Sequence, residues 1–251
     1  SVNIMKNLKA LFSKKVLVST WLVGLVILSL CAILFKEHSL QVYPGTYQEF
    51  VRSDSQDEGF SEASVSKTDS LLVLDFRLRS GSPTPYAGVG FSLASPMEIL
   101  KEEFLDFSAY DSLRVVLATN RMPKITIRLS VHDPLWTKPG DVSSARPLDV
   151  VLETTRNLKE HRVSLADFSV PEKWFDLMGI ENPDYWRHLE RGMRVEVLTA
   201  TGALLGIPDA FELKKLELYG TNRKLLYVLG VLAFLLSCAC GYGLVRLKQK
   251  G

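Results

Sequence analysis

Two long apolar runs, one near each end of the chain, constrain this protein more than any other feature. They cover Val16 to Phe35 and Leu225 to Val245, and neither contains a charged residue. An α-helix rises about 1.5 Å per residue and the hydrocarbon core of a bilayer is about 30 Å thick, so about 20 apolar residues suffice to cross it. The sequence therefore predicts two transmembrane helices, residues 16–35 and 225–245.

Basic residues near the ends of the two runs predict the orientation. The tails, residues 1–15 and 246–251, together carry a charge of +7, whereas all 28 acidic residues lie in the segment 36–224, whose net charge is −5. Lys and Arg close to a span resist translocation, while long loops cross largely regardless of charge. We therefore expect a protein of the bacterial inner membrane with cytoplasmic termini and a periplasmic central domain.

Two other interpretations of the first run are weaker. A cleaved signal peptide has an apolar stretch of about 7 to 15 residues and a small-residue exit site. This run is longer and ends in Leu34 and Phe35. Lipidation at Cys31 is also disfavoured, because Leu30 stands where such sites need a small side chain.

The segment 36–224 is long enough for one sizeable domain, which must be stabilised by its core. All three cysteines lie inside the predicted spans, so this segment cannot form a disulfide. Apolar residues alternate with polar ones over short stretches, which is typical of half-buried strands. Eight strands are expected, over residues 72–78, 87–93, 113–117, 125–131, 147–153, 160–165, 194–198 and 211–218. Short helices are expected over 95–104 and 171–178, after Ser95 and Val170, and the polar stretch 52–68 is expected to be an exposed loop.

Several motifs carry a family resemblance. They are Leu105-Asp106-Phe107-Ser108-Ala109-Tyr110-Asp111-Ser112-Leu113, Val131-His132-Asp133, Arg146-Pro147-Leu148, the segment from Val163 to Trp174, and the closing strand from Leu213 to Gly220. Over residues 43–220 the chain resembles the galactose-binding-like jelly rolls, which include carbohydrate-binding modules and the domains related to complex I intermediate-associated proteins. The resemblance implies an all-β fold, a jelly-roll β-sandwich, here flanked by transmembrane helices. Its motifs concern packing and say almost nothing about the ligand.

The arrangement of the segments carries a second resemblance. A jelly roll between two spans with cytoplasmic ends is similar to the sensory portion of bacterial membrane receptors, whose second span leads to a histidine kinase, a diguanylate cyclase or a DNA-binding module. Residues 246–251 hold no such module. The expectation is therefore either a truncated receptor or a stand-alone accessory subunit.

Motifs for catalysis are missing from the sequence. The chain has no His-Glu-x-x-His, Cys-x-x-Cys, Gly-x-Ser-x-Gly or phosphate-binding Gly-x-x-x-x-Gly-Lys pattern. Gly88-Val89-Gly90 indicates close strand packing rather than a nucleotide loop. We predict no catalytic residue, no metal and no cofactor.

Aromatic residues in loops are the best candidates for ligand binding, because an indole stacks on the apolar face of a sugar. Trp136 follows His132 and Asp133 at a strand exit, and Trp174 and Trp186 lie in later turns. The candidate ligand-binding residues are Trp136, His132, Asp133, Trp174, Trp186 and Arg146. The alternatives are that Trp174 and Trp186 close the ends of the sandwich, and that His132 and Asp133 make structural hydrogen bonds.

Small residues recur at four-residue spacing in the second span, at Ala233, Ser237 and Gly241. Such a face lets another helix approach closely in lipid. It predicts a homodimer, a membrane-protein partner or tight pairing with the first span.

The leading functional hypothesis is a membrane-anchored sensor. Its outer domain would bind a glycan, another small molecule or a partner protein, and the spans would report that event. The alternative is a non-catalytic assembly subunit of an envelope complex, and a carbohydrate-active enzyme is a third class. The net charge of −5 argues against nucleic acid, and against anionic glycans as the main ligand, although a local basic patch is compatible with it.

Overall fold

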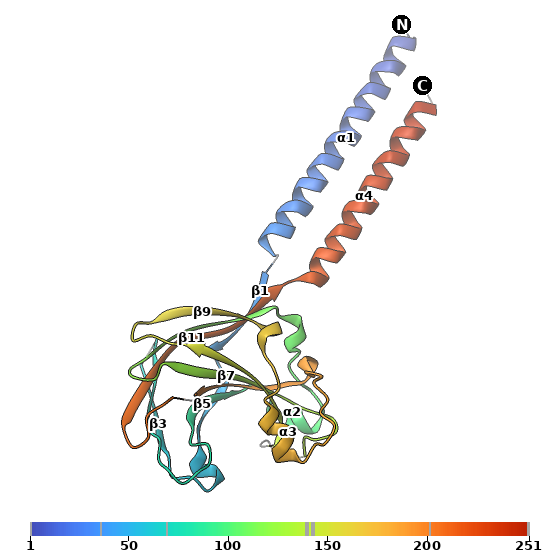
Figure 1. The fold of residues 1–251 in the computed structure, drawn as a ribbon. Helices are drawn as coiled ribbons and strands as arrows, with labels where there is room; N and C mark the ends of the chain where they lie inside the picture. Colours follow the sequence, from blue (N-terminus) through green and yellow to red (C-terminus); the bar gives the residue numbers. More distant parts are fainter. Residues whose placement is uncertain are drawn as a thin grey trace. The chain divides into compact units, whose positions relative to one another are not determined.

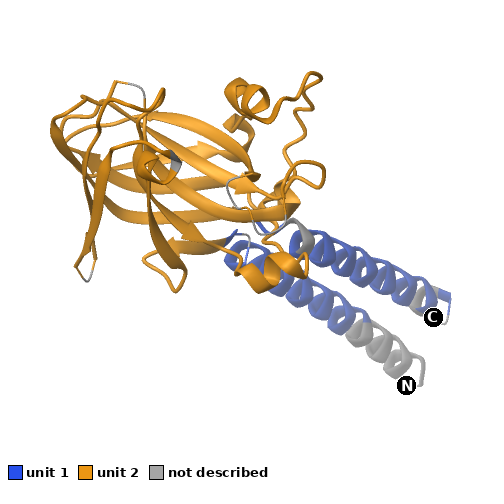
Figure 2. Cartoon of the chain, turned by 90° about the horizontal axis from the view of Figure 1, so that it is seen from below, with its two compact units in different colours: residues 1–38, 221–251 blue, residues 39–220 orange. Residues whose placement is uncertain are grey.

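The computed structural model describes residues 2–35, 37–68, 70–138, 141, 144–200 and 202–249. The chain divides into two compact units, which Figure 2 shows in different colours. One unit consists of residues 1–38 and 221–251, and the other of residues 39–220. The first is helical and the second is built from β-strands.

The helical unit is a pair of long helices, α1 (Val2–Leu34) and α4 (Arg223–Gln249), shown in blue and red in Figure 1. By length and composition, the segments Lys14–Leu34 and Leu225–Arg246 are candidate membrane spans. The contacts between the two helices identify them as antiparallel, because the partners' numbers fall along α4 as they rise along α1. The contacting pairs are Leu17 with Gly243, Trp21 with Ser237, and Gly24 with Leu236.

Only part of the small-residue pattern in α4 faces α1. Ser237 Oγ accepts a hydrogen bond of 3.2 Å from Trp21 Nε1, and a Cβ added at Gly24 would lie 2.6 Å from a methyl carbon of Leu236. In contrast, a Cβ added at Gly241 would meet no atom within 4 Å among the described residues. Gly241 therefore does not contribute to the packing between α1 and α4.

The second unit is a β-sandwich of two sheets, and the pairings between its strands within residues 48–221 are antiparallel. One sheet has the order β3-β4-β11-β6-β9, with β1 also paired to β11, and the other has the order β2-β5-β10-β7-β8. The strands are β1 (Glu37–Tyr43), β2 (Gln48–Ser53), β3 (Glu62–Lys67), β4 (Leu72–Arg77), β5 (Ala87–Ser92), β6 (Ser112–Thr119), β7 (Lys124–Val131), β8 (Arg146–Glu153), β9 (Lys159–Ser164), β10 (Gly192–Thr199) and β11 (Pro208–Thr221). The predicted all-β sandwich is confirmed.

The core lies between the two sheets and comes from the alternating apolar residues that identified the strands. Leu72, Leu74 and Phe76 of β4 are buried on one side, and Val195 and Val197 of β10 on the other. Each aliphatic side chain buried in this way contributes about 1.5–3 kcal/mol relative to an exposed one. Each of the eight strands expected from the sequence coincides with a strand of the structure.

Three strands were not expected from the sequence. The stretch 52–68 is not a loop throughout, because it contains the end of β2, a 3₁₀ turn η1 (Asp54–Asp57) and the whole of β3. In β3, a strand at the edge of its sheet, only Ala63 and Val65 pack against the core. A short edge strand with polar residues on its other face has too weak an alternation to be recognised.

The short helices are α2 (Pro96–Leu100) and α3 (Glu172–Met178). Ser95 caps α2 in a capping box with Glu98, and the helix ends at Leu100, earlier than predicted, two residues before Glu102, whose φ is +57°. Pro171 is itself the residue that precedes the first turn of α3, so Val170 lies one position further out than expected. Gly179, at a φ of +67°, ends α3 in the left-handed conformation that glycine adopts without strain.

Candidate ligand-binding surface

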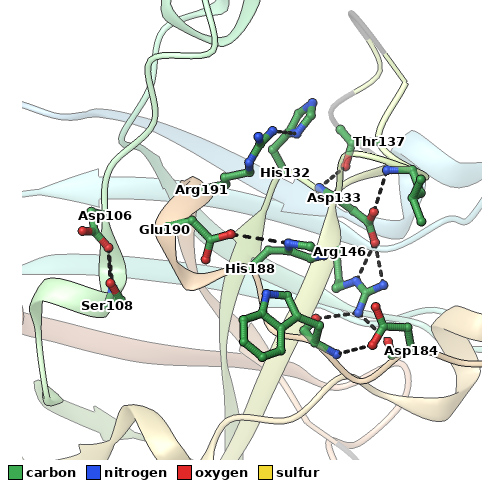
Figure 3. Close-up of polar contacts among 12 residues, drawn as sticks. Asp106, Ser108, His132, Asp133, Thr137, Arg146, Asp184, His188, Glu190 and Arg191 are labelled. Carbon is green, nitrogen blue, oxygen red and sulfur yellow. Dashed lines mark hydrogen bonds and ion pairs between the residues drawn. The ribbon is translucent and has the colours of Figure 1, made fainter.

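A buried ion pair joins two of the predicted site residues at one end of the sandwich (Figure 3). Asp133 follows β7 and Arg146 begins β8, and both side chains are only 1% exposed. Arg146 Nε donates a hydrogen bond of 2.7 Å to Asp133 Oδ2, and a terminal guanidinium nitrogen lies 2.6 Å from the same oxygen. Both charged groups are thus shielded from solvent, and the pair joins the loop after β7 to the start of β8.

The same arginine fixes a second loop. Arg146 Nη1 donates hydrogen bonds of 2.6 Å to the backbone carbonyl oxygens of Asp184 and Trp186. Its guanidinium also lies over the rings of Trp174 and Phe175, 5.1 and 5.8 Å from their centroids. Arginine suits this position because its planar fork offers five donors. One side chain therefore joins the loop after β7, the helix α3 and the segment around Trp186.

Asp133 also shapes its own loop. Its second carboxylate oxygen accepts a 2.8 Å hydrogen bond from the backbone N–H of Leu135, and its own N–H donates to Thr137 Oγ1 at 2.8 Å. These bonds are drawn in Figure 3. Trp136, between these residues, is half-buried and packs against the core. The turn thus holds Trp136 inward and leaves Leu135 exposed.

The three tryptophans occupy different environments. Trp174 lies in the core, whereas Trp186 is 64% exposed and its neighbour Tyr185 is 56% exposed. Tyr185 meets the buried ring of Phe175 edge-on, with centroids 5.1 Å apart. An end-closing role therefore fits Trp174 but not Trp186. Tyr185 and Trp186 together form an exposed aromatic pair on a backbone that Arg146 holds in place.

His132 lies beside this network and makes different contacts. Its ring lies 4.8 Å from that of Phe104, and Nδ1 is 3.4 Å from Arg191 Nη1. Its backbone N–H donates to the carbonyl oxygen of Arg191. Burial, and secondarily the positive charge of Arg191, lower the pKa of His132 below its ordinary value of 6.5. The neutral imidazole is therefore favoured in the folded protein.

A second cluster of polar residues lies on the face of the β2-β5-β10-β7-β8 sheet that points away from the core. This cluster was not anticipated from the sequence. The strand register places Phe50, Gly90, Glu196, Arg128 and Asp149 in one row across the five strands. Arg52 and Arg194 belong to the neighbouring rows. We call Arg52, Arg128, Arg194, Glu196 and Asp149 the arginine cluster. Its only sequence signal is the alternation of charged and apolar residues in strands such as Arg194-Val195-Glu196.

Glycines in β5 make room for this cluster. A Cβ added at Gly90 would lie 2.3 Å from Phe50 Cζ, and one at Gly88 would lie 2.4 Å from the carbonyl oxygen of Val197. The close approach predicted for Gly88-Val89-Gly90 is thus present. Because β5 has no side chains at these positions, the residues of β2 can reach across it to Glu196.

The arginine cluster is held together by ion pairs of unequal quality. Arg128 and Asp149 form a bidentate pair with two bonds of 2.7 Å. Burial is the largest single influence on Arg128 and lowers its pKa, but the hydrogen bond and the charge of Asp149, together with the charge of Glu196, outweigh it and raise the pKa of this arginine. Glu196 lies 3.5 Å from Arg52 Nε and 3.8 Å from Arg194 Nη1, and it accepts a 3.4 Å hydrogen bond from Ser130. In the part of the chain that is described, no group of three His, Cys, Asp or Glu side chains is placed to hold a metal ion.

Comparisons with known proteins identify the fold. No family model matches the chain, and no curated protein matches it in sequence. The similar solved structures include a family 11 carbohydrate-binding module from Clostridium thermocellum in complex with a β-1,3-1,4-mixed-linked tetrasaccharide, at 12% identity over 74% of this chain and 96% of that chain, with a TM-score of 0.50. They also include the family 11 module of the cellulosomal cellulase Lic26A-Cel5E of Clostridium thermocellum, at 10% identity over 72% and 93% of the two chains, with a TM-score of 0.49.

These findings assign the second unit to a structural class. Its two antiparallel sheets form a jelly-roll β-sandwich of the kind found in carbohydrate-binding modules. At 12% identity the likeness concerns the fold alone. Function must therefore be argued from the residues on the surface of this particular sandwich.

Proposed function

We propose that the jelly-roll domain binds a carbohydrate and that the two apolar helices anchor it in a membrane. The exposed pair Tyr185 and Trp186 supports this proposal most directly. Aromatic rings on a rigid backbone stack on the apolar face of a sugar at low cost in conformational entropy. The rigid backbone is provided by Arg146, which holds the carbonyl oxygens of Asp184 and Trp186 from below.

In this proposal the predicted site residues divide into two groups. Trp186 and the outer edge of Trp136 contact the ligand, together with His132 at the side of the surface. Asp133, Arg146 and Trp174 lie beneath and keep the contacting residues in position. Residues that only support a site affect binding through loop geometry, whereas those that touch the ligand affect it directly.

The test uses the full chain in detergent and a mixed-linked β-glucan tetrasaccharide, with isothermal titration calorimetry as the readout. We expect Trp186→Ala to weaken binding by about tenfold to a hundredfold, since an aromatic residue stacked in a binding site is worth on the order of 1–3 kcal/mol. Phe60→Ala is the matched control, because Phe60 is an aromatic residue of similar exposure, 63%, and lies between η1 and β3 rather than in the segments that carry Trp136 and Trp186. Equal loss in both variants, or unchanged binding in Trp186→Ala, would contradict the proposed surface.

We further propose that both termini are cytoplasmic, that the jelly roll is periplasmic in the bacterial inner membrane, and that the helices transmit ligand binding. The support is the excess of basic residues in the two tails and the tight contacts between α1 and α4. A cysteine placed at Ser55, in a variant lacking the three native cysteines, tests the topology. Labelling by an impermeant maleimide in intact cells with a permeabilised outer membrane supports it, and protection there contradicts it.

An assembly subunit of an envelope complex is the competing function. A stable large complex in mild detergent that persists in Trp186→Ala, together with no glycan binding by the wild-type chain, would establish that function instead. A homodimer through the second span would give a complex of twice the chain mass. Crosslinking in membranes distinguishes these two assemblies.

A further inference from the structure

The arginine cluster has more positive charge than its own acidic groups neutralise. It contains three guanidinium groups and two carboxylates, and Asp149 is occupied by its bidentate pair with Arg128. Glu196 is therefore shared by Arg52 and Arg194, at distances of 3.5 and 3.8 Å. A carboxylate that forms short charge-assisted hydrogen bonds lies at about 2.7–2.9 Å from its donors. Arg52 and Arg194 thus both lie near the same carboxylate, at distances longer than those of such short bonds.

The burial of these groups makes the imbalance costly. The side chains of Arg52, Arg194 and Glu196 are 17%, 10% and 1% exposed. Arg52 Nε and Glu196 Oε1 face each other at 3.5 Å, and neither of these two buried atoms has a hydrogen bond among the described residues, whereas Arg52 Nη1 donates a 3.4 Å bond to Gln56 Oε1. A buried polar atom that lacks a hydrogen-bond partner costs stability, and more so when it is charged. The cluster would gain from a ligand that brings an acceptor to the guanidinium groups.

The electrostatics of Arg194 lead to the same conclusion. Burial lowers the pKa of Arg194 most, and the nearby positive charges of Arg52 and Arg128 lower it further, against the opposing effect of Glu196. The protein thus holds a cation where its own environment disfavours one. An anion in front of the cluster would compensate this cost.

Aromatic rings flank the same cations. The guanidinium of Arg194 lies over the ring of Phe50, 5.6 Å from its centroid, and that of Arg52 lies over Tyr86, at 5.7 Å. Phe50 and Tyr86 are half-buried, so parts of both rings face solvent. Flat apolar surface next to guanidinium groups suits a ligand that carries a ring as well as a negative charge.

We propose that this face of the sheet binds an acidic sugar, whose carboxylate pairs with Arg52 and Arg194 and whose ring lies against Phe50 and Tyr86. The inference rests on the proposed carbohydrate-binding function and specifies a charged class of ligand at a second surface. The net charge of −5 for residues 36–224 does not oppose it, because recognition over a few ångströms depends on local charge. Arg128 adds to the positive potential, while Glu196 holds the other two arginines in place from below.

The experiment is calorimetric titration of the full chain in detergent with a galacturonate trisaccharide, and with the corresponding galactose trisaccharide as its neutral counterpart. We expect the acidic trisaccharide to bind at least tenfold more tightly, with an affinity that falls as salt rises. Arg52→Gln should weaken the binding of the acidic trisaccharide by about tenfold or more. Arg162→Gln, which removes an exposed arginine on β9, should not change it. Equal binding of the two trisaccharides, or equal affinity in wild type and Arg52→Gln, would overturn the inference.

Two further arms remove ambiguity. If Arg52→Gln lowers the thermal midpoint of unfolding, Arg52→Lys is the variant that tests the inference, because lysine keeps the positive charge but lacks the planar guanidinium. Arg52→Lys should still weaken binding of the acidic trisaccharide more than Arg162→Lys does. Sodium sulfate at matched ionic strength distinguishes binding of any anion from binding of a sugar acid. If sulfate competes with the acidic trisaccharide as strongly as free galacturonate does, the sugar assignment is overturned. Binding of the neutral β-glucan without the acidic sugar refutes this inference alone, whereas binding of neither also refutes the proposed function.

Discussion

Arg146 and Asp133 form an ion pair in which each side chain is 1% exposed, and the arginine also binds the backbone of the segment that carries Trp186. A buried pair of this kind is costly to break, because the remaining partner stays buried and charged. It links three parts of the chain, namely the loop after β7, the start of β8 and the segment before η5 (Leu189–Arg191). The stability of the domain and the placement of its exposed aromatic pair thus depend on the same residue.

We therefore expect Arg146→Met to lower the free energy of unfolding by about 3–5 kcal/mol, since it leaves Asp133 unpaired. Urea denaturation of the full chain in detergent, followed by tryptophan fluorescence, measures the change. Arg162→Met is the matched control, because its pair with Glu160 is exposed and such pairs contribute about 0–1 kcal/mol. If Arg146→Met combined with Asp133→Leu is no more stable than Arg146→Met alone, the unpaired carboxylate is not the cause.

The two glycines of β5 should respond differently to substitution. A Cβ at Gly88 would meet the backbone oxygen of Val197 at 2.4 Å, whereas one at Gly90 would meet the ring of Phe50, a side chain that can move. We expect Gly88→Ala to destabilise the domain by about 1–3 kcal/mol, the usual cost of overpacking, and Gly90→Ala by less. Thermal unfolding of both variants tests the order. If Phe50→Leu restores the stability lost in Gly90→Ala, the ring of Phe50 is the obstacle. A larger loss of stability in Gly90→Ala than in Gly88→Ala would contradict the packing described here.

The pairing of the two long helices gives a similar comparison. Gly24→Leu should disturb the pair because a Cβ there would lie 2.6 Å from Leu236, while Gly241→Leu should leave it intact because nothing lies within 4 Å among the described residues. Oxidative crosslinking between cysteines placed at Leu17 and Gly243, in a background without native cysteines, reports the pairing. We expect less crosslinking in Gly24→Leu. An equal loss in Gly241→Leu would contradict the packing between α1 and α4 described here.

The domain should lose stability on mild acidification. Burial and neighbouring positive charge lower the pKa of both His132 and His161 in the folded protein, below the ordinary value of 6.5. The unfolded chain then binds more protons between the folded pKa and 6.5, so stability is fully present above about pH 6.5 and declines as the pH falls through the folded pKa values. Unfolding curves between pH 7.5 and 5 measure this slope. His132→Gln with His161→Gln should flatten it, and an unchanged slope would assign it to other groups.

The hydrogen bond between Trp21 and Ser237 is a polar contact between two apolar helices. Contacts of this kind contribute about 0.6 kcal/mol on average in membrane proteins, so we expect Ser237→Ala to weaken the pair only slightly. The emission of Trp21 should shift to shorter wavelength once its indole N–H loses the hydroxyl. The background for this measurement carries phenylalanine at the other three tryptophans. An unshifted spectrum would show that the bond does not form in detergent.

The sequence determined the features that depend on local patterns. Two uninterrupted apolar runs define the long helices, and alternation of apolar residues identified eight of the eleven strands. Ser95 and Pro96 predicted the start of α2, since capping depends on neighbours within one turn. The strands β1, β2 and β3 were missed because their polar and apolar residues do not alternate strongly enough, and pairing with the rest of their sheets stabilises them.

Only the tertiary structure decided which residues meet. Trp174 and Trp186 both stand in turn-rich sequence, yet one is buried on α3 and the other exposed, because Arg146 binds the backbone of the second and the ring of the first. Arg52 and Glu196 are far apart in the sequence and become neighbours only through the order β2-β5-β10. Strand order and register are set by packing over the whole domain, so charge clusters between distant strands cannot be derived from a local pattern.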